Sequence, residues 1–164
     1  MKKFGAQALY VIVLYVLQSS LLPILAWHEI SADLLLVAVV SVSFLRGSRE
    51  GVAFGFCAGL LQDLATGTFF GVNIFSKMVI GYGCGAFTRH FFKEQFFLPL
   101  FSVIAASIAN YFIILMFMIL LGYRFDWKEQ ISGLLIPMMI FNAFFAFPVH
   151  FWTRKLSERF GAKS

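Results

Sequence analysis

Residues 51–89 read GVAFGFCAGLLQDLATGTFFGVNIFSKMVIGYGCGAFTR, and they are the part of the sequence most informative about its fold. Two apolar runs flank an uncharged turn over residues 66–71. Both runs are rich in glycine, and small residues let helix backbones approach closely in lipid, where packing replaces the hydrophobic attraction between helices. The stretch therefore predicts a helical hairpin inside a membrane.

Small residues recur every four positions on both helices of this hairpin, so they share one face of each helix. The first face carries Gly51, Gly55, Gly59 and Asp63, and the second carries Lys77, Gly81, Gly85 and Arg89. A chain folded about residue 70 pairs these positions by depth: Asp63 with Lys77, Gly59 with Gly81, Gly55 with Gly85, and Gly51 with Arg89. We expect the glycines to close the hairpin.

Asp63 and Lys77 are the two full charges predicted deep in the membrane. Each costs at least about 2.5 kcal/mol there unless it is paired or hydrated. A functional ionisable site is one interpretation, and a structural ion pair that fixes the hairpin is the other. The sequence favours the pair, because no third ionisable group is expected at that depth and a proton relay would lack its chain. Asp33 is expected in the first turn of another helix, where it suits the positive end of the helix dipole.

The composition predicts an integral membrane protein. Of the 164 residues, 60% are hydrophobic and 13% are charged, whereas soluble proteins have about 25% charged residues. The mean hydropathy is +0.86. We expect one all-α polytopic membrane domain over residues 1–164, a compact bundle surrounded by lipid. The six predicted transmembrane helices cover about residues 5–26, 32–45, 51–65, 71–88, 98–122 and 131–152.

Basic residues predict the orientation of these helices. Lys and Arg are concentrated on the cytoplasmic side of membrane proteins. Ten of them fall on one side of the predicted bundle: Lys2, Lys3, Arg46, Arg49, Arg89, Lys93, Arg154, Lys155, Arg159 and Lys163. Arg124 and Lys128 fall on the other side. Both termini are therefore predicted in the cytoplasm, which agrees with an even number of helices.

The sequence carries no recognisable catalytic, phosphate-loop or metal-binding motif. Its basic residues lie between apolar runs and do not form a patch with interleaved aromatics, so nucleic-acid binding is not expected. No enzyme activity, metal or cofactor is predicted. Asn110, in the middle of a helix, is expected to bond to a neighbouring helix. In the outer loop 123–130, Arg124 and Trp127 either contact a partner or anchor the loop at the membrane interface.

Several motifs of this chain resemble those of the rod shape-determining protein MreD family. They are Asp33–Leu36, Phe44–Gly51, Gly55, Gly59, Asp63–Gly67, Gly71 and Gly81–Tyr82. The most specific part is the D-L-x-T-G-x-x-x-G element from Asp63 to Gly71. Two positions depart from the family pattern: Ala32 stands where a proline is common, and Lys77 is not a residue of that pattern.

The resemblance implies a non-enzymatic subunit of the bacterial elongation machinery in the inner (cytoplasmic) membrane. It implies binding to MreC and, through MreC, a link to MreB filaments, RodA and a class B penicillin-binding protein, in support of cell shape and lateral peptidoglycan synthesis. It also implies a fold similar to the substrate-binding membrane subunits of energy-coupling-factor transporters.

Two rival functions remain open at this point. A solute-binding subunit of a vitamin-type transporter predicts a small molecule among Gln62, Asn73, Lys77 and Asn110. A lipid-handling enzyme or flippase predicts a hydrophilic cavity with convergent ionisable residues, of which the sequence supplies few. A scaffold that docks the membrane helix of MreC needs neither.

Overall fold

A computed structural model describes residues 2–20, 24, 32–67, 69–88, 97–124 and 126–161. The regular elements of these residues are all helical, so the all-α prediction is confirmed for them. Most of residues 21–26 of the first predicted helix lie outside the described residues, as does Arg89 of the predicted hairpin face.

The described residues form eight helical elements. In order they are α1 (Lys2–Ser20), α3 (Leu34–Arg46), α4 (Ser48–Thr66), α5 (Val72–Thr88), α6 (Leu98–Leu120), α7 (Trp127–Glu129), the π-helical turn η1 (Gln130–Leu135) and α8 (Ile136–Gly161). The π-helical turn ends just before Pro137, which has no N–H to donate to the preceding turn. Pro148 lies inside α8.

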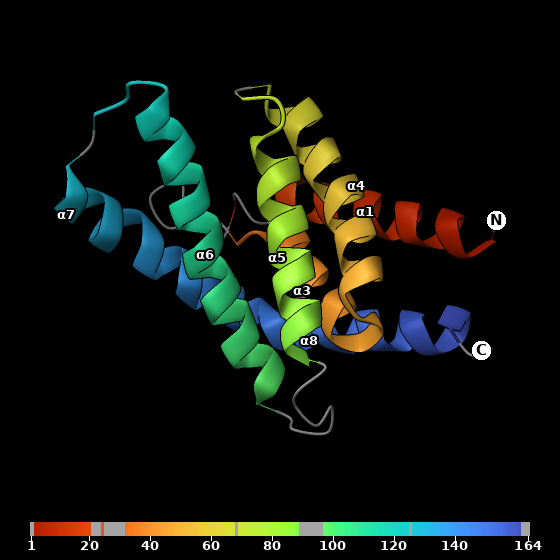
Figure 1. Cartoon of the computed structure of the whole chain (residues 1–164). Coiled ribbons are helices and arrows are strands. Elements are labelled where there is room, and N and C mark those ends of the chain that lie inside the picture. Colours follow the sequence, from red (N-terminus) through yellow and green to blue (C-terminus); the bar gives the residue numbers. More distant parts are fainter. Residues whose placement is uncertain are drawn as a thin grey trace.

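The core of the bundle is the short helix α3. Every residue from Leu34 to Phe44 is buried, and α3 contacts α1, α4, α5, α6 and α8. Its sequence is apolar on all sides, as expected of a helix with protein around it. In Figure 1, α4 and α5 stand in front of α3, with α6 beside them. The structure thus gives α3 the central place that the sequence suggests for the hairpin.

The outer helices present apolar side chains at the surface of the bundle. Large exposed hydrophobic residues include Phe101 and Phe112 on α6 and Ile140 and Phe144 on α8. Within the described residues, Leu98–Leu120 and Ile131–Arg159 are each long and apolar enough to cross a membrane. Such an exterior suits lipid better than water.

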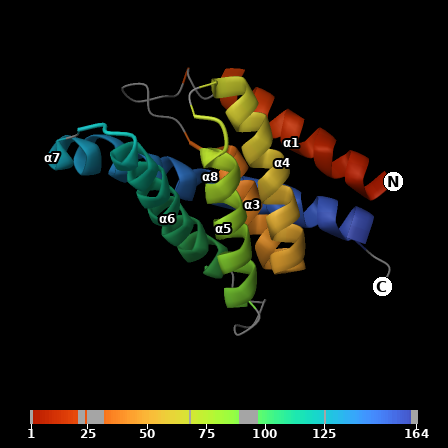
Figure 2. The ribbon, with the colours of Figure 1, turned by 45° about the horizontal axis from the view of Figure 1, so that its top comes forward.

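Both chain ends lie on the same side of the bundle. The start of α1 and the end of α8 point to one side in Figure 1 and again in Figure 2. The turn between α4 and α5 and the short helix α7 lie away from these ends.

The α4–α5 hairpin closes through glycines, in a register that differs from the predicted one. A Cβ added to Gly55 would lie 2.5 Å from the carbonyl oxygen of Lys77, and one added to Gly81 would collide with the backbone of Gly51. The predicted pairs of Gly55 with Gly85 and of Gly59 with Gly81 are therefore wrong. Gly85 instead meets Ser48, and Gly59 meets Ile74.

The register differs because the turn lies earlier in the chain than expected. The contacting pairs 51 with 81 and 55 with 77 have their midpoint at residue 66, not at residue 70. Helix α4 runs to Thr66 and ends at Gly67, whose φ of 64° is left-handed. Gly71, with a φ of 102°, precedes α5. Glycine adopts such angles without steric cost, which allows a tight turn at both positions.

We expect Gly55→Ala to destabilise the bundle. Its new methyl group must enter the backbone of α5, and overpacking of this kind costs about 1–3 kcal/mol. Gly83→Ala is the matched control on α5, because a Cβ at Gly83 meets nothing within 4 Å. Thermal unfolding in detergent measures the difference. Equal melting temperatures for the two variants would contradict the close approach of α4 and α5.

Candidate functional site

A charged pair lies at the centre of the bundle. The Nζ atom of Lys77 donates to Oδ2 of Asp33 at 2.9 Å. Lys77 is 0% exposed and Asp33 is 8% exposed. The predicted pair of Asp63 with Lys77 is therefore wrong, because Lys77 reaches across to the start of α3. Asp33 is a third ionisable group in the interior of the bundle, and the sequence did not predict it there.

Asp33 is held in position by bonds on both sides. Its Oδ1 atom accepts from the N–H of Leu36 at 3.0 Å and so caps α3. Its own N–H donates to Oδ1 of Asn142 on α8 at 2.8 Å. Asp33 thus caps its helix, close to the place expected at the helix start. Since α3 begins inside the bundle, the same carboxylate also meets the buried ammonium group.

Buried amides and hydroxyls extend this polar layer to α6. Nδ2 of Asn142 donates to Oγ of Ser107 on α6 at 2.8 Å. The hydroxyl of Ser76 on α5 donates to Oδ1 of Asn110 on α6 at 2.5 Å. The prediction that Asn110 bonds to a neighbouring helix is confirmed. The polar layer, defined here as Asp33, Ser76, Lys77, Ser107, Asn110 and Asn142, joins α3, α5, α6 and α8.

Asp63 has a different role at the hairpin turn. Its carboxylate accepts from the N–H groups of Gly71 at 2.8 Å, Asn73 at 3.2 Å and Ile74 at 3.1 Å, and from Nδ2 of Asn73 at 2.9 Å. These donors lie at and before the start of α5, where N–H groups have no partner within the helix. Asp63 is 1% exposed. Because these donors and the helix dipole stabilise its charge, it needs no lysine.

The element from Asp63 to Gly71 therefore works as one capped turn. The carbonyl group of Asp63 accepts from the N–H of Gly67 at 3.1 Å, while its side chain holds the start of α5. Gly67 and Gly71 adopt the two positive φ angles of this turn between α4 and α5.

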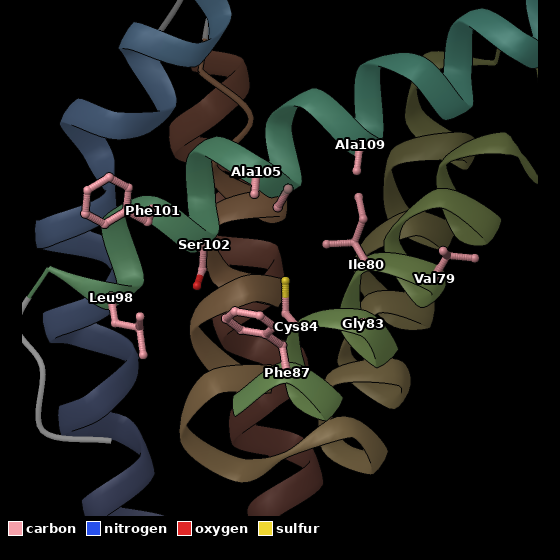
Figure 3. Close-up of a pocket in the computed structure, with 11 residues that line it drawn as sticks. Val79, Ile80, Gly83, Cys84, Phe87, Leu98, Phe101, Ser102, Ala105 and Ala109 are labelled. Carbon is pink, nitrogen blue, oxygen red and sulfur yellow. The ribbon is translucent and has the colours of Figure 1, made fainter. Parts of the chain in front are cut away.

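An apolar groove opens between α5 and α6 (Figure 3). Its volume is about 530 Å³. It is lined by Val79, Ile80, Gly83, Cys84 and Phe87 of α5 and by Leu98, Phe101, Ser102, Ala105, Ala106 and Ala109 of α6. Gly83, Ala105 and Ala109 are exposed. This groove was not predicted from the sequence. One pattern could have indicated it: Gly83 does not fit the four-residue spacing of the packed glycines, so it lies on a second face of α5.

The outer loop lies next to the hairpin turn. The rings of Tyr123 and Phe69 meet edge to face with centroids 5.8 Å apart. Arg124 is exposed beside Tyr123. Trp127 begins α7, and its side chain lies outside the described residues.

Comparison with known families identifies the chain. The family model described as rod shape-determining protein MreD matches residues 2–160. The chain belongs to the MreD family. Comparisons with curated proteins and with solved structures gave no match.

The MreD family is a family of membrane proteins, and membership in it fits a role in rod shape determination. The matched region contains the hairpin, the polar layer and the groove. In this MreD protein the polar layer is engaged in bonds between helices, so its geometry is that of a structural core.

We expect Lys77→Met to destabilise this MreD protein by about 3–5 kcal/mol, because it leaves the Asp33 carboxylate buried without a counter-charge. A second change, Asp33→Asn, should restore most of the stability, since asparagine also caps a helix and carries no charge. Unfolding of the single and double variants in detergent measures both effects.

The matched control is Asp63→Asn in the Lys77→Met background. The Asp63 carboxylate accepts from the start of α5 and not from Lys77, so no rescue is expected. If Asp63→Asn restored stability and Asp33→Asn did not, the result would contradict the Lys77–Asp33 pair and support the Asp63–Lys77 pair that the sequence predicts.

Proposed function

We propose that this MreD protein is a non-enzymatic membrane scaffold of the bacterial elongation complex, and that the α5–α6 groove docks the single membrane helix of MreC. The observation that carries the proposal is an apolar, laterally open groove with small residues on both walls. Exposed Gly83, Ala105 and Ala109 let a partner backbone come close, as helix association in lipid requires.

The bonds of the polar groups favour a scaffold over a solute-binding subunit. Lys77, Asn110 and Asn73 are three of the four side chains that a small molecule was expected to contact. They already bond to Asp33, Ser76 and Asp63, respectively. A solute would have to replace these bonds, and those of Lys77 and Asn110 lie in the buried polar layer, where a lost hydrogen bond is costly. The transporter subunit is therefore the second candidate.

The proposal includes six membrane-spanning helices with both termini in the cytoplasm. The chain ends share one side of the bundle, and α8 carries Arg154, Lys155 and Arg159 in its last turns. The α3–α4 turn adds Arg46 and Arg49. This distribution supports a cytoplasmic position for that side. A fold similar to the energy-coupling-factor substrate-binding subunits belongs to the same proposal.

The outer loop completes the proposed interface. Arg124 and Trp127 lie on the side with fewer basic residues, where MreC would place its periplasmic portion. Contact between Tyr123 and Phe69 ties this loop to the hairpin turn. Through MreC the scaffold would be linked to MreB, RodA and a class B penicillin-binding protein in lateral peptidoglycan synthesis.

We expect Gly83→Leu to reduce co-purification of MreC in mild detergent by about tenfold, a loss of about 1.4 kcal/mol in binding. The leucine projects into open space in the groove, so the bundle should still fold. Cells that depend on this variant should lose their rod shape.

The matched control is Gly5→Leu on α1, which also adds a leucine where a Cβ meets nothing within 4 Å. It should leave MreC recovery and cell shape unchanged. Full MreC recovery with Gly83→Leu would contradict the proposal that the α5–α6 groove docks the MreC helix. Purification of the chain without MreC but with a tightly bound vitamin would favour the transporter subunit instead.

A further inference from the structure

A second cleft lies on the other side of the bundle, between α1 and the last turns of α8. Its volume is about 620 Å³. It is lined by Tyr10 and Val13 of α1 and by Trp152, Lys155, Leu156, Glu158 and Arg159 of α8. The proposed function uses none of these residues.

The two walls of this cleft are held apart at a fixed spacing by Tyr10. Its hydroxyl lies 2.8 Å from Oγ1 of Thr153 and also donates to the carbonyl oxygen of Val149 at 3.4 Å. Its ring lies 6.2 Å from that of Phe54 on α4. Tyr10 therefore ties α1 to both α8 and α4 and forms the back of the cleft, while Val13, 44% exposed, faces outward.

The wall that α8 gives to this cleft combines apolar and basic side chains. Trp152 and Leu156 are apolar, Lys155 lies between them in the chain, and Arg159 follows one turn later; both cations are exposed. Glu158 also lines the cleft, but its carboxylate pairs with Arg154 at 2.9 Å. The balance of charge along this wall of the cleft is therefore positive.

An apolar slot with two cations on one wall is complementary to an anionic amphiphile. We propose that this cleft binds one anionic phospholipid, with an acyl chain against Val13, Trp152 and Leu156 and the phosphate next to Lys155 and Arg159. Long basic side chains near helix ends extend to the membrane interface, where lipid phosphates lie. The cations belong to the basic end of the chain, and anionic lipids attract such residues in the cytoplasmic leaflet.

The charge arm of the test uses native mass spectrometry of the full chain in detergent, with phosphatidylglycerol or phosphatidylcholine of the same acyl chains added. The unaltered chain should retain phosphatidylglycerol in preference. The double change Lys155→Gln and Arg159→Gln should lower its retention by about tenfold, since each cation near a lipid surface contributes several-fold to binding. Arg49→Gln, an exposed cation outside the cleft on the same side, should have no effect.

A second part of the test fills the apolar part of the cleft without changing the charge of the protein. Val13→Trp should lower retention of both lipids, whereas Val16→Trp should not. Val16 is 52% exposed on the same helix but does not line the cleft. Both valines are exposed, so both variants should fold.

Three outcomes would overturn the proposal. One is equal retention of the two lipids by the unaltered chain. Another is equal loss in a cleft variant and its control. The third is loss of MreC recovery with Val13→Trp together with unchanged lipid retention, because the cleft would then hold a protein helix. Loss confined to the cleft variants supports the lipid, whatever the outcome for MreC at the α5–α6 groove.

Discussion

Lys77 places a full positive charge where no solvent reaches, and the rest of the bundle is arranged to neutralise it. Asp33 provides the counter-charge, Asn142 fixes the backbone of Asp33, and Ser107 fixes the amide of Asn142. Each of these partners comes from a different part of the chain. An unpaired buried charge is costly. Packing arrangements that separate Lys77 from Asp33 are therefore disfavoured. We interpret the pair as a device that selects one arrangement of α3, α5, α6 and α8.

The same residue also links this polar layer to the glycine face. The backbone of Lys77 lies against Gly55, while its side chain reaches Asp33. A larger residue at position 55 would push α5 away from α4 and move the ammonium group relative to α3. Asp63 adds to this constraint from the turn, since its four hydrogen bonds fix where α5 begins. Helix spacing, helix start and charge pairing therefore support one another.

The sequence was informative about which residues matter and less informative about what they meet. Glycines spaced by four identify the packed faces, but sliding one helix past the other by whole turns leaves that spacing unchanged. The predicted register, centred on residue 70, was therefore wrong although the faces were right. Asp63 was assigned a lysine because the free N–H groups at the start of α5 were not counted as partners. Asp33 was expected at the start of a helix, but the sequence does not show that this 13-residue helix begins inside the bundle, within reach of Lys77.

A polar layer whose groups are bonded to one another leaves recognition to the outer surface. The two clefts there differ in chemistry: the α5–α6 groove has small apolar walls, and the α1–α8 cleft adds two cations. They also lie apart, because α6 and α1 are on opposite sides of the hairpin in both views (Figures 1 and 2). A membrane helix in one and an anionic lipid in the other would not compete for space. Since α3 contacts helices of both clefts, a rigid core would let this small protein hold a partner at a fixed orientation to the lipid surface.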